Sequence, residues 1–131
     1  MTAYPEMVSA YGEFGEQLMR VGDGKIVCKR GAEGYQIIGL LPGVLYPDAP
    51  GVGIALKVSD GDPSRTALDL THSTRVRPAV ALEVLRQLGV LSSEQLESLG
   101  AFGPVKPIQN HRGIITGQSC PVFKLSHTDE K

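Results

Sequence analysis

A lysine that leads into a glycine-rich turn is the residue best placed for chemistry in this sequence. Lys29 is followed by Arg30-Gly31-Ala32-Glu33-Gly34, so two glycines stand within five residues of its ammonium. Glycine lets the backbone approach a bound molecule and adopt angles that a side chain obstructs. A lysine there could move a proton or offset negative charge that develops on a substrate. Lys29 is therefore a candidate catalytic residue, with Gly31, Glu33 and Gly34 as candidate substrate-binding residues.

Each of these residues also has a plain structural interpretation. An arbitrary lysine at the end of a strand lies in solvent, and a glutamate between Ala32 and Gly34 more often shapes a turn than binds a ligand. The glycines would then contribute the shape of the turn. Lys57 alternates with Ala55 on an expected strand, and we interpret it as a solvated or ion-paired lysine.

Candidate metal ligands do not form a recognisable set. Asp60-Gly61-Asp62 resembles the start of a calcium loop, but no glutamate stands at the twelfth position, and a turn with Arg65 as ion-pair partner is favoured. The three histidines stand singly, with no partner at ligand spacing: His72, His111 and His127. We predict no metal site and no cofactor.

Composition limits the class of partner and the compartment. The formal net charge is -1, with 13 basic and 14 acidic side chains spread along the chain, which argues against nucleic acid as a partner. The amino terminus lacks the pattern of a signal peptide, and no apolar segment has the length of a membrane span. Cys28 and Cys120 lie far apart in the sequence and fit reduced thiols. We expect a soluble cytoplasmic protein that does not act at a membrane.

The elements that must position Lys29 begin with a helix from about Pro5 to about Arg20. The helix is predicted by an apolar face made of Met7, Tyr11, Phe14 and Leu18. Two glycines inside it, Gly12 and Gly15, lower its helix propensity. Three strands follow, at Ile26–Cys28, Tyr35–Leu40 and Val52–Val58. Their short links predict an antiparallel meander.

The second half of the chain predicts two more helices and another strand. An apolar face between Val76 and Leu88 predicts a helix that Gly89 ends, and Ser92 with Gln95 has the spacing of a capping box for a third helix that Gly100 closes. A turn at 110–113 leads into a fourth strand around Ile114 and Ile115, and residues 128–131 are expected to fray. The length suits one domain over 1–131, with an α+β fold in which helices cover one face of an antiparallel sheet.

Several motifs, taken in order, resemble one protein family. They are Cys28-Lys-Arg-Gly-Ala-Glu-Gly34, Gly53-Ile-Ala-Leu-Lys57 running into Asp60-Gly-Asp62, Val84-Leu-Arg-Gln-Leu-Gly89, and Asn110 with Gly113. This combination is similar to the bacterial asparaginase family typified by the thermolabile rhizobial enzyme, whose fold is similar to serine β-lactamases and glutaminases. The resemblance spans about Pro5 to Leu125 and matches only the later part of the family's sequence.

The resemblance implies hydrolysis of asparagine to aspartate and ammonia through a serine acyl-enzyme. In that family a Ser-x-x-Lys pair and the metal-binding residues lie upstream, and a second lysine, which Lys29 matches, comes from the Lys-x-Gly strand. No serine of this chain has a lysine three residues later. A serine hydroxyl is a weak nucleophile without such a base. We therefore expect the chain to be inactive alone.

Three hypotheses follow from the missing pair. The chain could be the carboxy-terminal half of an asparaginase that is completed by a separate upstream polypeptide, with a small amide such as asparagine as substrate. It could instead be a non-catalytic binding or vestigial module of the same fold, or a gene fragment. As half of a domain, the isolated chain is expected to expose apolar surface and to associate with itself.

Overall fold

The computed structural model describes residues 2–59 and 76–127 of the 131. The turn predicted at Asp60 and Asp62 with Arg65, the surface position of His72, and the frayed end at 128–131 lie outside these residues. Within the described ranges, no helix is both long enough and apolar enough to cross a bilayer.

The sheet that carries Lys29 is the antiparallel meander that the sequence predicts. Its strands are β1 (Ile26–Gly31), β2 (Tyr35–Leu40) and β3 (Val52–Lys57), hydrogen-bonded in the order β1-β2-β3. The strand β1 runs three residues beyond the predicted Cys28, so Lys29 lies inside the strand. Its cross-strand neighbour is Ile37, which in turn pairs with Ala55.

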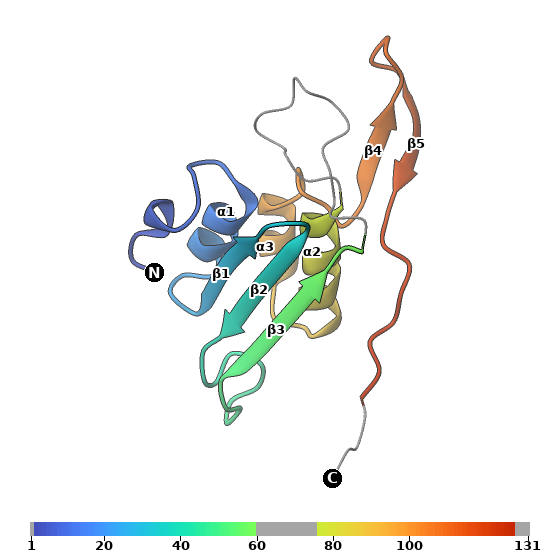
Figure 1. Cartoon of the computed structure of the whole chain (residues 1–131). Helices are drawn as coiled ribbons and strands as arrows, with labels where there is room; N and C mark the ends of the chain where they lie inside the picture. Colours follow the sequence, from blue (N-terminus) through green and yellow to red (C-terminus); the bar gives the residue numbers. More distant parts are fainter. Residues whose placement is uncertain (1, 60–75, 128–131) are drawn as a thin grey trace.

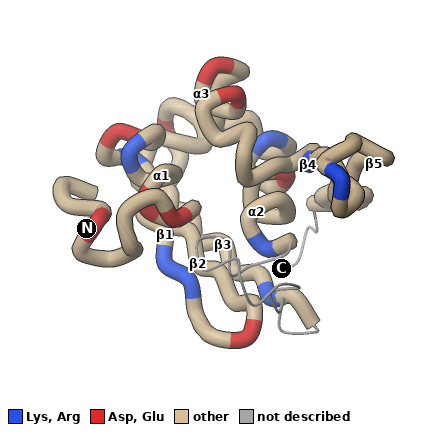
Figure 2. Tube along the Cα trace, turned by 90° about the horizontal axis from the view of Figure 1, so that it is seen from above, with Lys and Arg blue, Asp and Glu red and all other residues tan. Residues whose placement is uncertain are grey.

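One face of this sheet packs against helices and forms the core. The helices α1 (Phe14–Val21), α2 (Arg77–Gln87) and α3 (Ser93–Ser98) lie on one side of the three strands (Figures 1 and 2). Strand residues buried against them include Ile26 and Cys28 of β1 and Ile38 of β2. The α+β fold with helices on one face of an antiparallel sheet is confirmed.

The first helix is shorter than predicted. The segment holds a 3₁₀ turn, η1 (Pro5–Met7), and α1 begins only at Phe14. Phe14 is buried, whereas Met7 and Tyr11 are both 82% exposed and do not continue its apolar face. The interruption lies at Gly12, whose φ of +83° is incompatible with a right-handed helix.

The later helices end and begin as the sequence predicts. Past α2, Gly89 takes a φ of +70°, its N–H donates to the carbonyl of Arg86, and the N–H of Val90 donates to that of Leu85. These two bonds are the Schellman pattern that stops a helix. At α3, Ser92 and Gln95 form both hydrogen bonds of the capping box.

A separate hairpin follows the helices. It pairs β4 (Lys106–Gln109) with β5 (Ile115–Ser119) through a turn in which Asn110 Oδ1 accepts from the N–H groups of Arg112 and Ile114. The turn and β5 match the prediction, but β4 was missed. We call residues 105–119 the hairpin arm, which projects from the body (Figure 1).

Candidate active site

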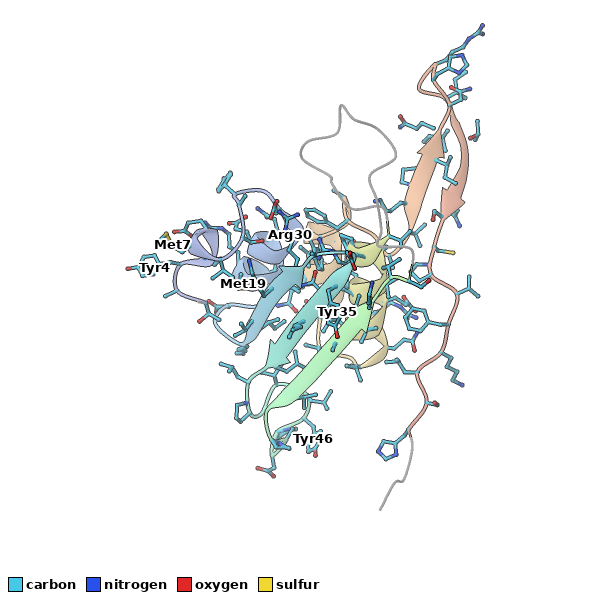
Figure 3. All side chains as sticks on the ribbon, viewed as in Figure 1. Tyr4, Met7, Met19, Arg30, Tyr35 and Tyr46 are labelled. Atoms are coloured by element: carbon cyan, nitrogen blue, oxygen red, sulfur yellow. The ribbon has the colours of Figure 1, made fainter. Side chains whose placement is uncertain are left out.

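Lys29 lies on the face of the sheet that no helix of the described residues covers. Side chains alternate across a strand, so Lys29 points away from the core into which its neighbour Cys28 points. Figure 3 shows Tyr35 on this uncovered side of the sheet. We call this surface the open face. It consists of Val27, Lys29 and Gly31 of β1, Tyr35, Ile37 and Gly39 of β2, and Gly53, Ala55 and Lys57 of β3.

The open face is apolar at its centre and basic at its sides. Ile37 is 54% exposed and Tyr35 is 41% exposed, although both belong to the middle strand. Lys29 and Lys57 stand on the two outer strands. A ligand or polypeptide on this face would therefore meet an apolar surface with an ammonium group at either side.

The turn after Lys29 has the backbone that its glycines suggest. Glu33 and Gly34 have φ values of +57° and +76°, and the Tyr35 N–H donates to the Ala32 carbonyl at 3.4 Å. Two successive positive φ values characterise a type I′ hairpin turn. The unusual backbone predicted for Gly34 is therefore present.

Gly31 contributes space rather than a special backbone angle. Its φ is not positive, but a Cβ built there would stand 3.0 Å from the Cβ of Tyr35. A side chain at this position would have to displace the start of β2. Glu33 is exposed, which agrees with either the structural or the substrate-binding interpretation of its carboxylate.

Lys57 supports the turn from the opposite strand. Its side chain is exposed and its Nζ donates to the carbonyl of Glu33 at 2.9 Å, while the Val58 N–H donates to the carbonyl of Gly34 at 3.1 Å. We interpreted Lys57 as solvated or ion-paired, and the structure adds this backbone contact. The lysine and the turn on the open face thus hold each other in place.

The ammonium of Lys29 reaches a backbone oxygen at the edge of the sheet. Its Nζ donates to the carbonyl of Val8 at 3.1 Å. Beside it, the Arg30 guanidinium forms an ion pair with Glu13 at 3.1 Å, and Ser9 Oγ donates to the same carboxylate. These contacts fix the segment between η1 and α1 along β1. Sequence reasoning missed Val8 and Glu13, since no spacing motif marks them.

Beneath Lys29 the core contains a small polar pair. The thiol of Cys28 is fully buried, and burial raises its pKa to about 12 although the charge of Arg77 opposes this. The buried Gln36 donates from Nε2 to Cys28 Sγ, whereas its Oε1 has no hydrogen-bond partner among the described residues. Cys28 is thus a small buried residue of the core.

The chemistry that these residues support is limited. Lys29 can donate a hydrogen bond or carry positive charge on an accessible surface, but the hydrogen bond that the structure gives its Nζ goes to a backbone oxygen. In residues 2–59 and 76–127, no group of three or more His, Cys, Asp or Glu side chains could hold a metal ion. The site as described is a positioned lysine beside a rigid turn.

The chain was compared with known protein families and with curated proteins. A family model described as L-asparaginase II matches residues 1–121. No curated protein matches the chain.

Proposed function

The chain belongs to the L-asparaginase II family, and from this membership we propose that it contributes Lys29 to the hydrolysis of a side-chain amide, with asparagine as the first substrate to test. The observation that carries the proposal is the position of Lys29 on the open face, next to a turn whose backbone is fixed. A substrate above the turn would meet the ammonium, with Gly31, Glu33 and Gly34 as its proposed contacts.

The proposed reaction needs a Ser-x-x-Lys element that these 131 residues do not contain. A serine Oγ from a Ser-x-x-Lys element attacks the amide carbon, ammonia leaves after gaining a proton, and water then cleaves the ester to release aspartate and the serine. No serine of this chain has a lysine at the required position. The chain is thus proposed to be the carboxy-terminal half of a β-lactamase-like catalytic domain. The partner would dock over the open face, where Lys29 can offset charge on the reacting oxygen.

Reassembly with an upstream half tests this proposal. Neither half alone should release ammonia from asparagine, and the mixture should do so. Replacing Lys29 by Met keeps the length and apolar stem of the side chain but removes its charge. Turnover by the mixture should then fall by about 10²-fold or more, while the two halves still associate.

The open face offers a matched control for this substitution. Lys57→Met removes the same charge from the opposite outer strand, where the ammonium holds the Glu33 carbonyl, and should lower turnover much less than Lys29→Met. Glu33→Gln should also have a small effect if this residue mainly shapes the turn. Tight association without hydrolysis, or full activity of Lys29→Met, would exclude the catalytic assignment.

A non-catalytic binding module is the second candidate. The observation in its favour is the hydrogen bond from Lys29 Nζ to Val8, which already uses the ammonium inside the chain. On this alternative, asparagine would bind to the reassembled protein with an affinity that Lys29→Met leaves unchanged. Calorimetric titration with asparagine distinguishes the two candidates.

The proposed compartment is the reducing cytoplasm. Both thiols are free, Cys28 in the core and Cys120 on the surface, and this supports a compartment in which exposed thiols stay reduced. Intact mass of the chain purified without reductant would show an oxidised or linked Cys120 if the protein matures in an oxidising compartment.

A further inference from the structure

The ammonium of Lys29 is held by a segment from outside the sheet. A lysine side chain has a flexible four-carbon stem and three N–H donors. The carbonyl of Val8 accepts from one of them at 3.1 Å, and Nζ has no other acceptor among the described residues. Two donors therefore remain for a substrate oxygen. The orientation of the ammonium depends on where Val8 lies.

The segment that carries this carbonyl is fixed by contacts at both of its ends. It consists of residues 8–13, between η1 and α1, and we call it the N-terminal strap. The N–H of Ser9 donates to the carbonyl of Pro5, which anchors the strap to η1. At its other end, the N–H of Gly12 donates at 3.1 Å to the carboxylate of Glu16, a fully buried residue of α1.

Glu13 connects the strap to the strand that carries Lys29. It is the N-cap residue of α1, yet its side chain makes no capping hydrogen bond. Its carboxylate instead pairs with Arg30 at 3.1 Å and accepts from Ser9 Oγ at 3.2 Å. Arg30 is next to Lys29 in β1 (Figure 3). Ser9 follows Val8 in the strap. One carboxylate thus contacts the neighbours of both residues that share the hydrogen bond.

A glycine in α1 provides the space for this arrangement. A Cβ built at Gly15 would stand 2.8 Å from the Oγ of Ser9, a residue that is only 8% exposed. A side chain at position 15 would therefore displace the Ser9 hydroxyl from its place beside Glu13. The glycine that lowers the helix propensity of this segment thus allows the strap to pack closely on α1.

We propose that Glu13 positions Lys29: its carboxylate holds the strap along β1, so that the Val8 carbonyl orients the ammonium toward a substrate oxygen on the open face. Glu13 acts through Lys29 and is not itself catalytic. A flexible side chain that is oriented before the substrate arrives loses less freedom in the reaction, which favours turnover. The proposal rests on the catalytic role proposed for Lys29, but the position of the ammonium can be measured in this chain alone.

Acylation of lysines by an amine-reactive ester, with mass spectrometry of the peptides, tests this position. Glu13→Ala should raise the labelling rate of Lys29 by about two- to fivefold, the range expected for loss of an exposed ion pair. The rate at Lys57 should not change, because its acceptor is the carbonyl of Glu33 and lies outside the strap. An unchanged rate at Lys29, or an equal rise at both lysines, would overturn the proposal.

A second variant moves the strap without changing any charge. Gly15→Ala displaces the Ser9 hydroxyl, while alanine is favoured over glycine inside a helix and α1 itself should persist. This variant should also raise labelling at Lys29. Circular dichroism checks that it is folded. Unchanged labelling at Lys29 in the folded variant would show that the strap does not hold the ammonium.

A matched control removes a neighbouring carboxylate. Glu6 lies in η1 and pairs at 3.4 Å with Arg20 of α1, not with the guanidinium on β1. Glu6→Ala should therefore leave the labelling of Lys29 as it is in the parent chain. A rise equal to that in Glu13→Ala would mean that any loss of negative charge near the amino terminus has this effect, and would contradict a specific role for Glu13.

Ammonia release by the reassembled halves shows whether Glu13 acts through Lys29. Glu13→Ala should lower turnover in the parent mixture but cause no further loss in a Lys29→Met background, because two residues that act as one unit are not additive. Additive losses would place the effect of Glu13 elsewhere and overturn the proposal. If the parent mixture released no ammonia, the proposed function would fail, whereas the labelling rates would still decide whether Glu13 holds the ammonium of Lys29.

Discussion

The two thiols of the chain lie in opposite surroundings. Cys28 is fully buried with its pKa raised to about 12, whereas Cys120 is exposed. At about pH 8 to 9, where an ordinary cysteine begins to ionise, a thiol reagent should label Cys120 and spare Cys28 until the chain unfolds. Mass spectrometry of labelled native and denatured protein counts the sites. Equal labelling rates at both cysteines would contradict the buried position of Cys28.

The same thiol should make folding stability fall in alkali. In the unfolded chain Cys28 loses its proton near its ordinary pKa of 9.0, but in the folded chain only near 12. The unfolded state therefore binds fewer protons across this window, and the free energy of unfolding decreases as the pH rises through it. Urea unfolding at several pH values should show this decrease, and Cys28→Ala should reduce it.

Single residues were predicted best where local backbone chemistry determines them. The turn at Glu33 and Gly34 could be predicted because glycine favours a positive φ, which Gly34 adopts. The partner of Lys29 could not, because the Val8 carbonyl comes beside it only when the segment before α1 folds along β1. Such contacts depend on tertiary structure, which leaves no spacing pattern in the sequence.

At the scale of elements, the capping box at α3 should contribute measurably to the free energy of unfolding. Ser92→Ala removes the side-chain oxygen that accepts from the Gln95 N–H, and should lower the free energy of unfolding by about 1 kcal/mol. Ser98→Ala is the control, because that hydroxyl only donates to a carbonyl within α3 and should have little effect. Urea unfolding measures both. If both variants lost the same free energy of unfolding, the capping box would not be what stabilises α3.

Helix and strand boundaries followed the sequence where capping and turn signals agree. Gly89 and Ser92 marked the end of α2 and the start of α3 correctly. The apolar spacing of Met7 and Tyr11 predicted a longer first helix, which was wrong because the positive φ at Gly12 interrupts it. The strand β4 was missed because it is short and contains Pro107, a residue that sequence patterns place outside strands.

At the scale of the whole molecule, the open face should bind a hydrophobic dye. Tyr35 and Ile37 are partly exposed in the centre of a sheet whose other side holds the core. An apolar surface of this kind binds such dyes, and an upstream half that docks over it should displace the dye as it restores activity. Fluorescence titration measures the release. Ile37→Asp should lower dye binding, and unchanged fluorescence in that variant would place the dye elsewhere.

The segment between η1 and α1, which Lys29 and Arg30 hold, makes the two edges of the sheet different. It lies along β1, the outer strand that carries Lys29, whereas β3 has a hydrogen-bonded neighbour among the described residues only on its β2 side. A strand supplied by another polypeptide would meet this segment beside β1, so we expect it to lengthen the sheet beyond β3, two strands away from the lysine. The edge at which a strand can be added is therefore the one opposite Lys29. Strands added there would leave Lys29 accessible on the open face.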